Sequence, residues 1–243
     1  MNASPEHQRI LLDVADLDRR IAQAERARTK PAQASRIAEL VAIRQEQLRE
    51  LTTLTGTRDD ARTELKRLES DVTLVEQRRT RDSERLAAAT NAKEAQALEH
   101  ELASLAKRQS DLEDIELAVM ARVEDADAAV AAQQALLDVT TAEGSALTAQ
   151  AKADVAAATE LGSQLARDRQ AVTESLPAPL LAEYTRRAAN SAGAALLTRG
   201  TCEGCRMLLP GTDLNDIRRA ADDAVVSCPE CGCILVRTEE SGL

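Results

Sequence analysis

The chain has 243 residues, with no Trp, no Phe and one Tyr, and 30% of its residues are charged. Large globular cores usually contain aromatic rings, so this mixture of Ala, Leu, Glu and Arg favours long helices or coiled coil. The net charge of −10 opposes broad binding to nucleic acid or anionic membranes. No apolar run reaches about 18 residues, the length of a transmembrane helix, and the polar N-terminus lacks a signal-peptide pattern. We therefore expect a cytoplasmic protein without membrane contacts.

Residues 6–29 have apolar side chains at alternating spacings of three and four, which is the pattern of a heptad seam. This seam consists of Ile10, Val14, Leu17, Ile21 and Ala24. Pro31 follows it. Because proline removes an amide donor and clashes with the preceding turn, it predicts a kink near residue 31.

Two longer seams follow, and in each of them eleven of sixteen sites are apolar. The second seam consists of Ile37, Leu40, Arg44, Gln47, Leu51, Leu54, Arg58, Ala61, Leu65, Leu68, Val72, Val75, Arg79, Asp82, Leu86 and Ala89. The third consists of Leu98, Leu102, Leu105, Gln109, Leu112, Glu116, Val119, Val123, Ala126, Val130, Gln133, Leu137, Thr140, Gly144, Leu147 and Ala151. Asn91 is a good N-cap with Glu94 three residues later, so we place a turn near residues 88–91.

A short connection between two legs of similar length makes them antiparallel. In an antiparallel pair, the residue numbers of two facing positions add up to the same total along the whole pair. The heptad spacing of the two seams allows a total of 177 or 184. We expect 177, in which Leu65 faces Leu112. Residues 1–176 are thus predicted to form an antiparallel coiled-coil hairpin. Residues 177–243 are predicted to form a linker helix around Tyr184 and a small β zinc ribbon, with residues 180–243 separable from the helical rod. The fold class is therefore mainly α.

The cysteines carry the clearest chemical signal. All five lie in the last 42 residues, and four form two Cys-x2-Cys pairs that are 22 residues apart, namely Cys202, Cys205, Cys228 and Cys231. In a reducing compartment, clustered cysteines favour a metal over disulfides. Two such pairs suit tetrahedral zinc at Zn–S distances of about 2.3 Å. We therefore predict one structural Zn²⁺ in a closed site.

Residues around these cysteines support the same interpretation. Gly204 and Gly232 lie where the two turns need small residues and positive φ, and residues 234–236 are typical of a short strand. Cys233 is a fifth cysteine. It is either a spare thiol for redox sensing or ligand exchange, or a small residue on the strand, and we favour the second interpretation.

Motifs along nearly the whole chain carry a family resemblance. They are Leu17-Asp18, Thr90-Asn91-Ala92-Lys93-Glu94, Leu98-Glu99-His100-Glu101, Tyr184, Gly200, Leu209-Pro210 and Cys228-Pro229-x-Cys231-Gly232. With the cysteine spacing, they resemble the bacterial C4-type zinc-ribbon family with a long N-terminal coiled-coil hairpin. The resemblance implies zinc binding and contact with protein or RNA. Members often carry Arg at the position of Cys233 and an aromatic residue at that of Val236.

The distribution of charged residues along the sequence indicates which parts of the chain could bind nucleic acid. From residue 196 to 243 there are five Arg and eight Asp or Glu, so the ribbon itself is acidic and lacks aromatic stacking platforms. Two basic clusters are better candidates for contacts with RNA, DNA or an acidic protein. They are Arg78, Arg79, Arg81, Arg85 and Lys93 near the turn, and Arg186, Arg187 and Arg199 beside the ribbon. The alternative for both clusters is a solvated helix face.

No nucleophile–base pair, phosphate-binding loop or open metal site is evident, so we expect neither an enzyme nor a small-molecule substrate. The sequence favours a non-catalytic zinc-binding coiled-coil adaptor for a protein partner. Two alternatives stay open. One is RNA binding through the basic clusters, and the other is a zinc-thiolate redox sensor that uses Cys233.

Overall fold

The computed structural model describes residues 1–243, which form two compact units. Unit 1 comprises Met1–Ala34 and Ala149–Leu243, and unit 2 comprises Ser35–Thr148. The boundary that we expected between residues 176 and 177 lies inside unit 1. None of the helices combines the length and the hydropathy that a bilayer-spanning segment needs.

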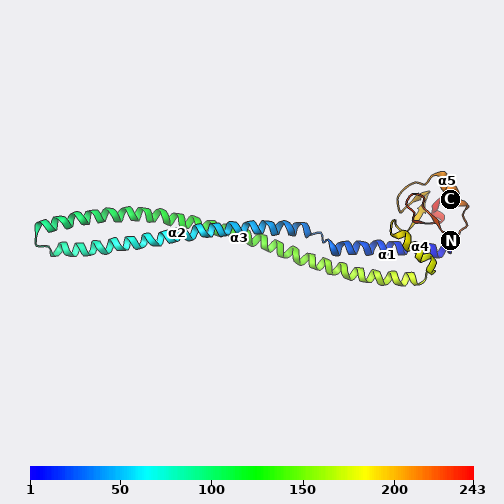
Figure 1. The fold of residues 1–243 in the computed structure, drawn as a ribbon, viewed down its shortest axis with the longest axis horizontal. Coiled ribbons are helices and arrows are strands. Elements are labelled where there is room, and N and C mark those ends of the chain that lie inside the picture. Colours follow the sequence, from blue (N-terminus) through cyan, green and yellow to red (C-terminus); the bar gives the residue numbers. More distant parts are fainter. The chain divides into compact units, whose positions relative to one another are not determined.

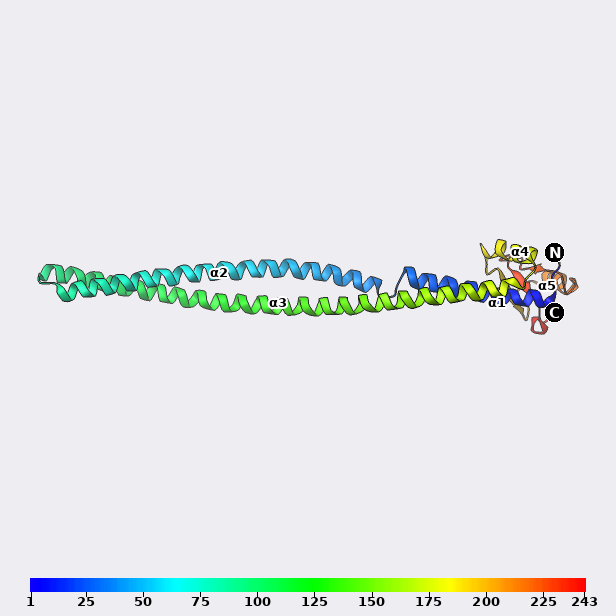
Figure 2. The same ribbon diagram turned by 90° about the horizontal axis from the view of Figure 1, so that it is seen from below.

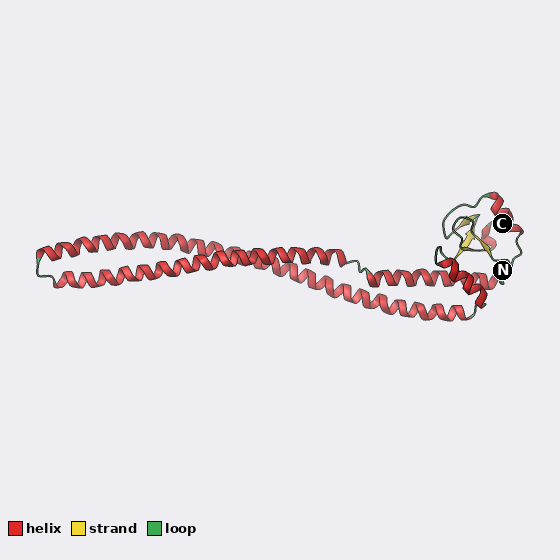
Figure 3. Ribbon diagram, in the orientation of Figure 1, coloured by secondary structure: helices red, strands yellow, loops and turns green.

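Helices dominate the fold, and a small sheet follows them along the chain (Figure 3). The helices are α1 (Pro5–Thr29), α2 (Ala34–Ala88), α3 (Ala92–Glu174), α4 (Ala178–Ala188) and α5 (Gly211–Arg219), with a 3-10 turn η1 (Glu239–Ser241). The strands are β1 (Ala194–Thr198), β2 (Thr201–Cys202), β3 (Val226–Ser227) and β4 (Ile234–Val236). The mainly α fold class, the helical hairpin and the small C-terminal sheet are thus confirmed.

Unit 2 consists of α2 and the part of α3 up to Thr148, which run side by side, as both Figure 1 and Figure 2 show. Every residue of the second and third seams is at least partly buried except Arg44, because these positions face the partner helix. The turn lies at residues 89–91, where the Lys93 amide donates to the Asn91 side chain at 2.9 Å. The predicted turn and N-cap are both confirmed.

Ion pairs across unit 2 define the register of its two helices. Arg62 donates to both carboxylate oxygens of Asp127 at 2.8 Å, and Arg122 donates to Glu64 at 3.0 Å. These flanking pairs match the register in which Leu65 faces Val119. If Leu65 faced Leu112, both pairs would be one heptad out of step. The expected register, in which the numbers of facing residues add up to 177, is therefore wrong. The ion pairs support the other register, in which they add up to 184.

In unit 1, α1 packs against the last part of α3. The break between Thr29 and Ala34 contains Pro31, which confirms the predicted kink. Within this break, Gln33 donates to Asp154 on α3 at 2.7 Å. A Cβ at Gly162 would lie only 3.8 Å from the Cβ of Ala24, so the two backbones approach closely here.

The sheet has the order β2-β1-β4-β3, in which only the β1–β4 pair is parallel. Side chains alternate between its two faces. Ile234 and Val236 pack with Leu11 and Val14 of α1, whereas Leu235 packs with the cysteines on the other face. Strand β4 agrees with the prediction, but β1 was not anticipated. Because α1 and the ribbon share one hydrophobic core, the expectation that they are separable is wrong.

Candidate metal centre

The first Cys-x2-Cys turn follows directly after β2. The Arg206 amide donates to the carbonyl of Cys202 at 2.7 Å, which folds Cys205 back beside it. The positive φ falls on Arg206, at 58°, and not on Gly204 as we expected. Gly204 is required for space instead, because a Cβ there would lie 3.0 Å from the Cβ of Ala195 and 3.3 Å from the sulfur of Cys233.

The second turn leads into β4. The Gly232 amide donates to the carbonyl of Cys228 at 2.9 Å, and Gly232 has the expected positive φ, 75°. The Cys228 amide donates in turn to the carbonyl of Cys233 at 2.9 Å. The turn is therefore closed at both ends by backbone hydrogen bonds, which hold Cys228 and Cys231 on the same side.

The four predicted ligands converge. The sulfurs of Cys202, Cys205, Cys228 and Cys231 all lie within 4.8 Å of one another. The Cys202–Cys231 and Cys205–Cys228 sulfur distances are 3.9 and 3.8 Å. A tetrahedron with Zn–S bonds of about 2.3 Å has edges of roughly 3.8 Å. The sulfurs thus stand at ligand distances, and the donor set suits one structural zinc.

The protein surroundings act differently on the individual thiols. Burial raises the pKa of Cys228 to about 12. Burial acts in the same direction on Cys231, but hydrogen bonds from the Cys233 amide and from neighbouring thiols outweigh it and lower the pKa of Cys231 to about 7. Zinc binds thiolates, so binding releases these protons. Four thiolates complete a tetrahedral zinc site and leave no position for a substrate.

Cys233 belongs to this sulfur cluster, which its sequence position alone did not show. Its side chain is fully buried, and its sulfur lies 3.4 Å from that of Cys231 and 3.6 Å from that of Cys202. These separations are as short as those between the ligands themselves. The interpretation as merely a small residue on the strand is therefore incomplete, because Cys233 is a fifth thiol at the metal centre.

The predicted basic cluster at Arg186 and Arg187 is engaged within the protein. Both guanidinium groups contact Glu183 at 2.7 Å, and these hydrogen bonds, that of Arg186 foremost, lower the pKa of Glu183 to about 2. Arg187 also donates to the carbonyl of Gly232. Arg187 therefore joins α4 to the second cysteine turn and is not a free cation.

The predicted cluster near the turn of unit 2 divides into two groups. Arg78 pairs with Glu101 at 2.6 Å, Arg85 pairs with Asp82 at 3.4 Å, and the half-buried Arg79 bonds Gln109 on α3. Arg81 and Lys93 form no ion pair. Fewer positive charges are thus available here than the sequence suggested.

A polar contact among three helices was not anticipated. The Tyr184 hydroxyl on α4 donates to Asp18 on α1 at 2.8 Å, and Arg169 on α3 also donates to Asp18. Burial, followed by this hydrogen bond, raises the pKa of Tyr184 well above its usual value. Asp18 and Tyr184 are 166 residues apart in sequence, so no local pattern links them.

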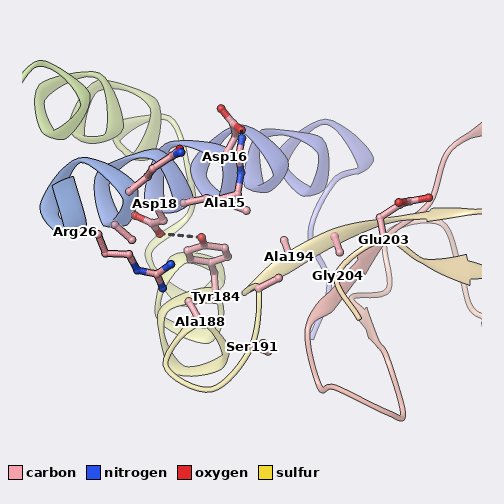
Figure 4. A pocket seen from close by; sticks show the side chains of 15 residues that line it. Ala15, Asp16, Asp18, Arg26, Tyr184, Ala188, Ser191, Ala194, Glu203 and Gly204 are labelled. Atoms are coloured by element: carbon pink, nitrogen blue, oxygen red, sulfur yellow. Dashed lines mark hydrogen bonds and ion pairs between the residues drawn. The ribbon is translucent and has the colours of Figure 1, made fainter. Parts of the chain in front are cut away.

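Beside this contact lies an open pocket of about 770 Å³, formed by α1, α4, β1 and the first cysteine turn. Figure 4 shows Asp18 and Tyr184 pointing toward each other at one side of it. Alanines form much of its lining, and its charged side chains have both signs. The pocket is lined by Ala15, Asp16, Asp18, Arg19, Ala22, Gln23, Arg26, Tyr184, Ala188, Ser191, Ala192, Ala194, Ala195, Glu203 and Gly204.

Fold and site together define a zinc-ribbon protein with a coiled-coil hairpin. Residues 14–192 match the CT398-like coiled coil hairpin domain, and residues 201–235 match the C4-type zinc ribbon domain. The chain therefore belongs to the family of CT398-like coiled-coil hairpin proteins with a C4-type zinc ribbon.

Relatives are similar along their full length. "Uncharacterized protein Rv2229c" from Mycobacterium tuberculosis is 32% identical, with 98% of each chain covered. A solved structure from Mycobacterium smegmatis is 31% identical with a TM-score of 0.80, covering 98% of this chain and 100% of the other. CT398 from Chlamydia trachomatis has a TM-score of 0.60 at 19% identity, covering 95% and 97% of the two chains, and it shares the fold.

Proposed function

We propose that this protein is a non-catalytic, cytoplasmic zinc-binding adaptor that holds a protein partner at the pocket beside α1, α4 and the ribbon. The observation that supports this function is the chemistry of the pocket. Its alanines offer apolar surface, and its charged side chains have both signs. Such a lining suits a protein segment with an apolar side chain, whereas a polyanion needs a positive surface.

The metal centre supports the same proposal. A zinc ion held by four thiolates stabilises the fold and has no open position for catalysis. Its role in the adaptor is to fix β1 and the first cysteine turn, which form one side of the pocket. The adaptor function thus needs no catalytic site at the zinc.

The test is affinity capture with the full zinc-loaded chain, followed by direct binding between purified partners. Ala22→Trp places a large side chain at an exposed pocket residue of α1, and Ala131→Trp makes the same change at an exposed residue of α3 in unit 2. We expect Ala22→Trp to weaken direct binding at least about tenfold, or about 1.4 kcal/mol, and Ala131→Trp to leave it unchanged. Equal binding by both variants would exclude the pocket.

RNA binding is the second candidate, and it rests on the free cations near the turn of unit 2. Arg81 and Lys93 form no ion pair, although Arg78 and Arg85 are engaged. In a gel shift with single-stranded RNA at low salt, this function requires a shift that the double variant Arg81→Ala, Lys93→Ala loses. Lys66→Ala, an exposed lysine farther along α2, is the matched control. No shift at low salt rejects RNA binding.

A further inference from the structure

The ribbon holds one thiol more than a tetrahedral zinc needs. Cys233 is the second residue after the second Cys-x2-Cys pair, and its side chain faces the ribbon core with the ligands. Its sulfur is nearer to Cys231, at 3.4 Å, than to Cys202, at 3.6 Å. A disulfide requires an S–S distance of about 2.05 Å, so a modest movement joins Cys231 to Cys233.

Access selects Cys231 as the thiol that meets an oxidant first. Cys202 and Cys228 are buried, whereas Cys231 is only partly buried. Cys205 is also partly buried, but its sulfur lies against that of Cys228, whereas the sulfur of Cys233 contacts those of Cys202 and Cys231. Only Cys231 therefore combines solvent access with a neighbouring spare thiol.

The backbone between the two thiols has room to adjust. Gly232 separates them, and a Cβ added there would meet no atom within 4 Å. Its φ of 75° is freely available to glycine. The side of Gly232 that a Cβ would occupy is therefore open, which leaves space there for a local rotation that brings the two sulfurs together.

We propose that Cys231 and Cys233 form a peroxide-responsive dithiol, in which Cys233 resolves the oxidised Cys231 and the ribbon gives up its zinc. This inference rests on the metal centre and not on the adaptor function, so the two stand or fall separately. The oxidant is hydrogen peroxide or another hydroperoxide.

The reaction proceeds in two balanced steps. The thiolate sulfur of Cys231 attacks one peroxide oxygen, the O–O bond breaks, and hydroxide leaves and takes a proton from solvent to become water. The sulfur of Cys233 then attacks the sulfenic sulfur of Cys231. The S–O bond breaks, and the departing hydroxide takes the Cys233 proton as a second water. Two thiols are oxidised to one disulfide, and one hydrogen peroxide is reduced to two waters.

Loss of one thiolate leaves Cys202, Cys205 and Cys228 around the metal, so its affinity falls and zinc is released. A dithiol reductant restores both thiols by exchange, and the site refills. Without Cys233, the sulfenic acid on Cys231 persists and advances to sulfinic acid, which ordinary thiols do not reduce. Cys233 thereby makes the zinc loss reversible.

The experiment treats the zinc-loaded full chain with hydrogen peroxide and follows zinc with a colorimetric chelator. Acid quenching, denaturation and alkylation then identify free thiols by mass spectrometry. Trypsin releases residues 220–237 as one peptide that contains Cys228, Cys231 and Cys233. Among the three cysteines of this peptide, we expect only Cys228 to be alkylated, and the peptide to be two hydrogens lighter because Cys231 and Cys233 are joined. Zinc binding should return after treatment with dithiothreitol.

Cys233→Ser and Cys233→Ala provide the comparison. After the same treatment, we expect both variants to carry sulfinic acid on Cys231 and to regain less than about a tenth of their zinc after reduction. Reversible release in both variants would overturn the proposal. If neither variant binds zinc, the proposal is tested by which cysteines of the unsubstituted chain are alkylated after peroxide treatment. A free Cys233, or a disulfide between Cys228 and Cys231, overturns the proposal.

Discussion

Tyr184 is the only aromatic residue of the chain, and it is 1% exposed in the core shared by α1, α4 and the ribbon. The Tyr184 ring also explains why residue 193 is a glycine. A Cβ at Gly193 would lie 2.5 Å from the Tyr184 ring, and Gly193 has a φ of 72°. No other residue contributes to the aromatic absorbance of the chain. The absorbance of this one side chain therefore monitors the packing of the core of unit 1.

An alkaline titration measures this burial. The pKa of Tyr184 is raised in the folded protein by burial and by the Asp18 carboxylate. The unfolded chain ionises near the ordinary value of about 10, so stability is unaffected below that pH and falls as pH rises above it. We expect absorbance at about 295 nm to show no tyrosinate in the folded protein at a pH where the urea-unfolded chain is half ionised. Coincident curves would contradict this.

Arg187 and Arg186 offer a matched pair of substitutions. Both pair with Glu183, but only Arg187 also donates to the Gly232 carbonyl in the second cysteine turn. We expect Arg187→Ala to lower the unfolding free energy of the zinc-loaded protein by about 1 to 3 kcal/mol. Arg186 is exposed, and Arg186→Ala should change it by less than about 1 kcal/mol. Urea unfolding checks both values, and equal effects would rule out a separate role for the Gly232 contact.

At the scale of elements, the sequence was most informative where the pattern was local. The heptad seams of α2 and α3 predicted their buried faces correctly except at Arg44, because burial in a coiled coil depends on position within the repeat. The register was missed because a seam looks the same after a shift of seven residues. The pair Arg62–Asp127 resolves that ambiguity, so flanking charges carried the missing information.

Strand β1 illustrates the opposite case. Its five residues, Ala194–Thr198, have no strong strand pattern, and its parallel neighbour β4 lies about 40 residues later. Long-range pairing of this kind is not encoded in a short window. The four ligands were predicted because their spacing is local, whereas the place of Cys233 depends on the pairing of β1 with both β4 and β2.

Helical glycines give a prediction for these elements. A Cβ at Gly56 of α2 or Gly144 of α3 would meet no atom within 4 Å. Because glycine is less favourable than alanine inside a helix by about 0.8 to 1 kcal/mol, Gly56→Ala and Gly144→Ala should each stabilise the protein by about that amount. Thermal unfolding followed by circular dichroism measures the gain. Gly193→Ala is the control, and its clash with Tyr184 should lower stability instead.

At the scale of the whole molecule, we expect zinc binding to stabilise unit 1 and the buried seams of α2 and α3 to stabilise unit 2. The ribbon contributes Ile234 and Val236 to the core around Tyr184, whereas unit 2 is held by side chains of α2 and α3. A structural C4 zinc site supplies folding free energy on the order of 10 kcal/mol, and the ribbon core alone is small. Loss of the metal should therefore open the shared core of unit 1 and leave the seams of unit 2 intact.

Removal of zinc by a chelator tests this division. We expect the ribbon to unfold and the alkaline titration of Tyr184 to move toward that of free tyrosine, since Ile234, Val236 and Gly193 no longer cover its ring. Most of the helical circular dichroism signal should remain, because the α2–α3 seam contains no cysteine. Added zinc should restore the folded titration curve. A collapse of the helical signal on chelation would show instead that the hairpin seam depends on the metal centre.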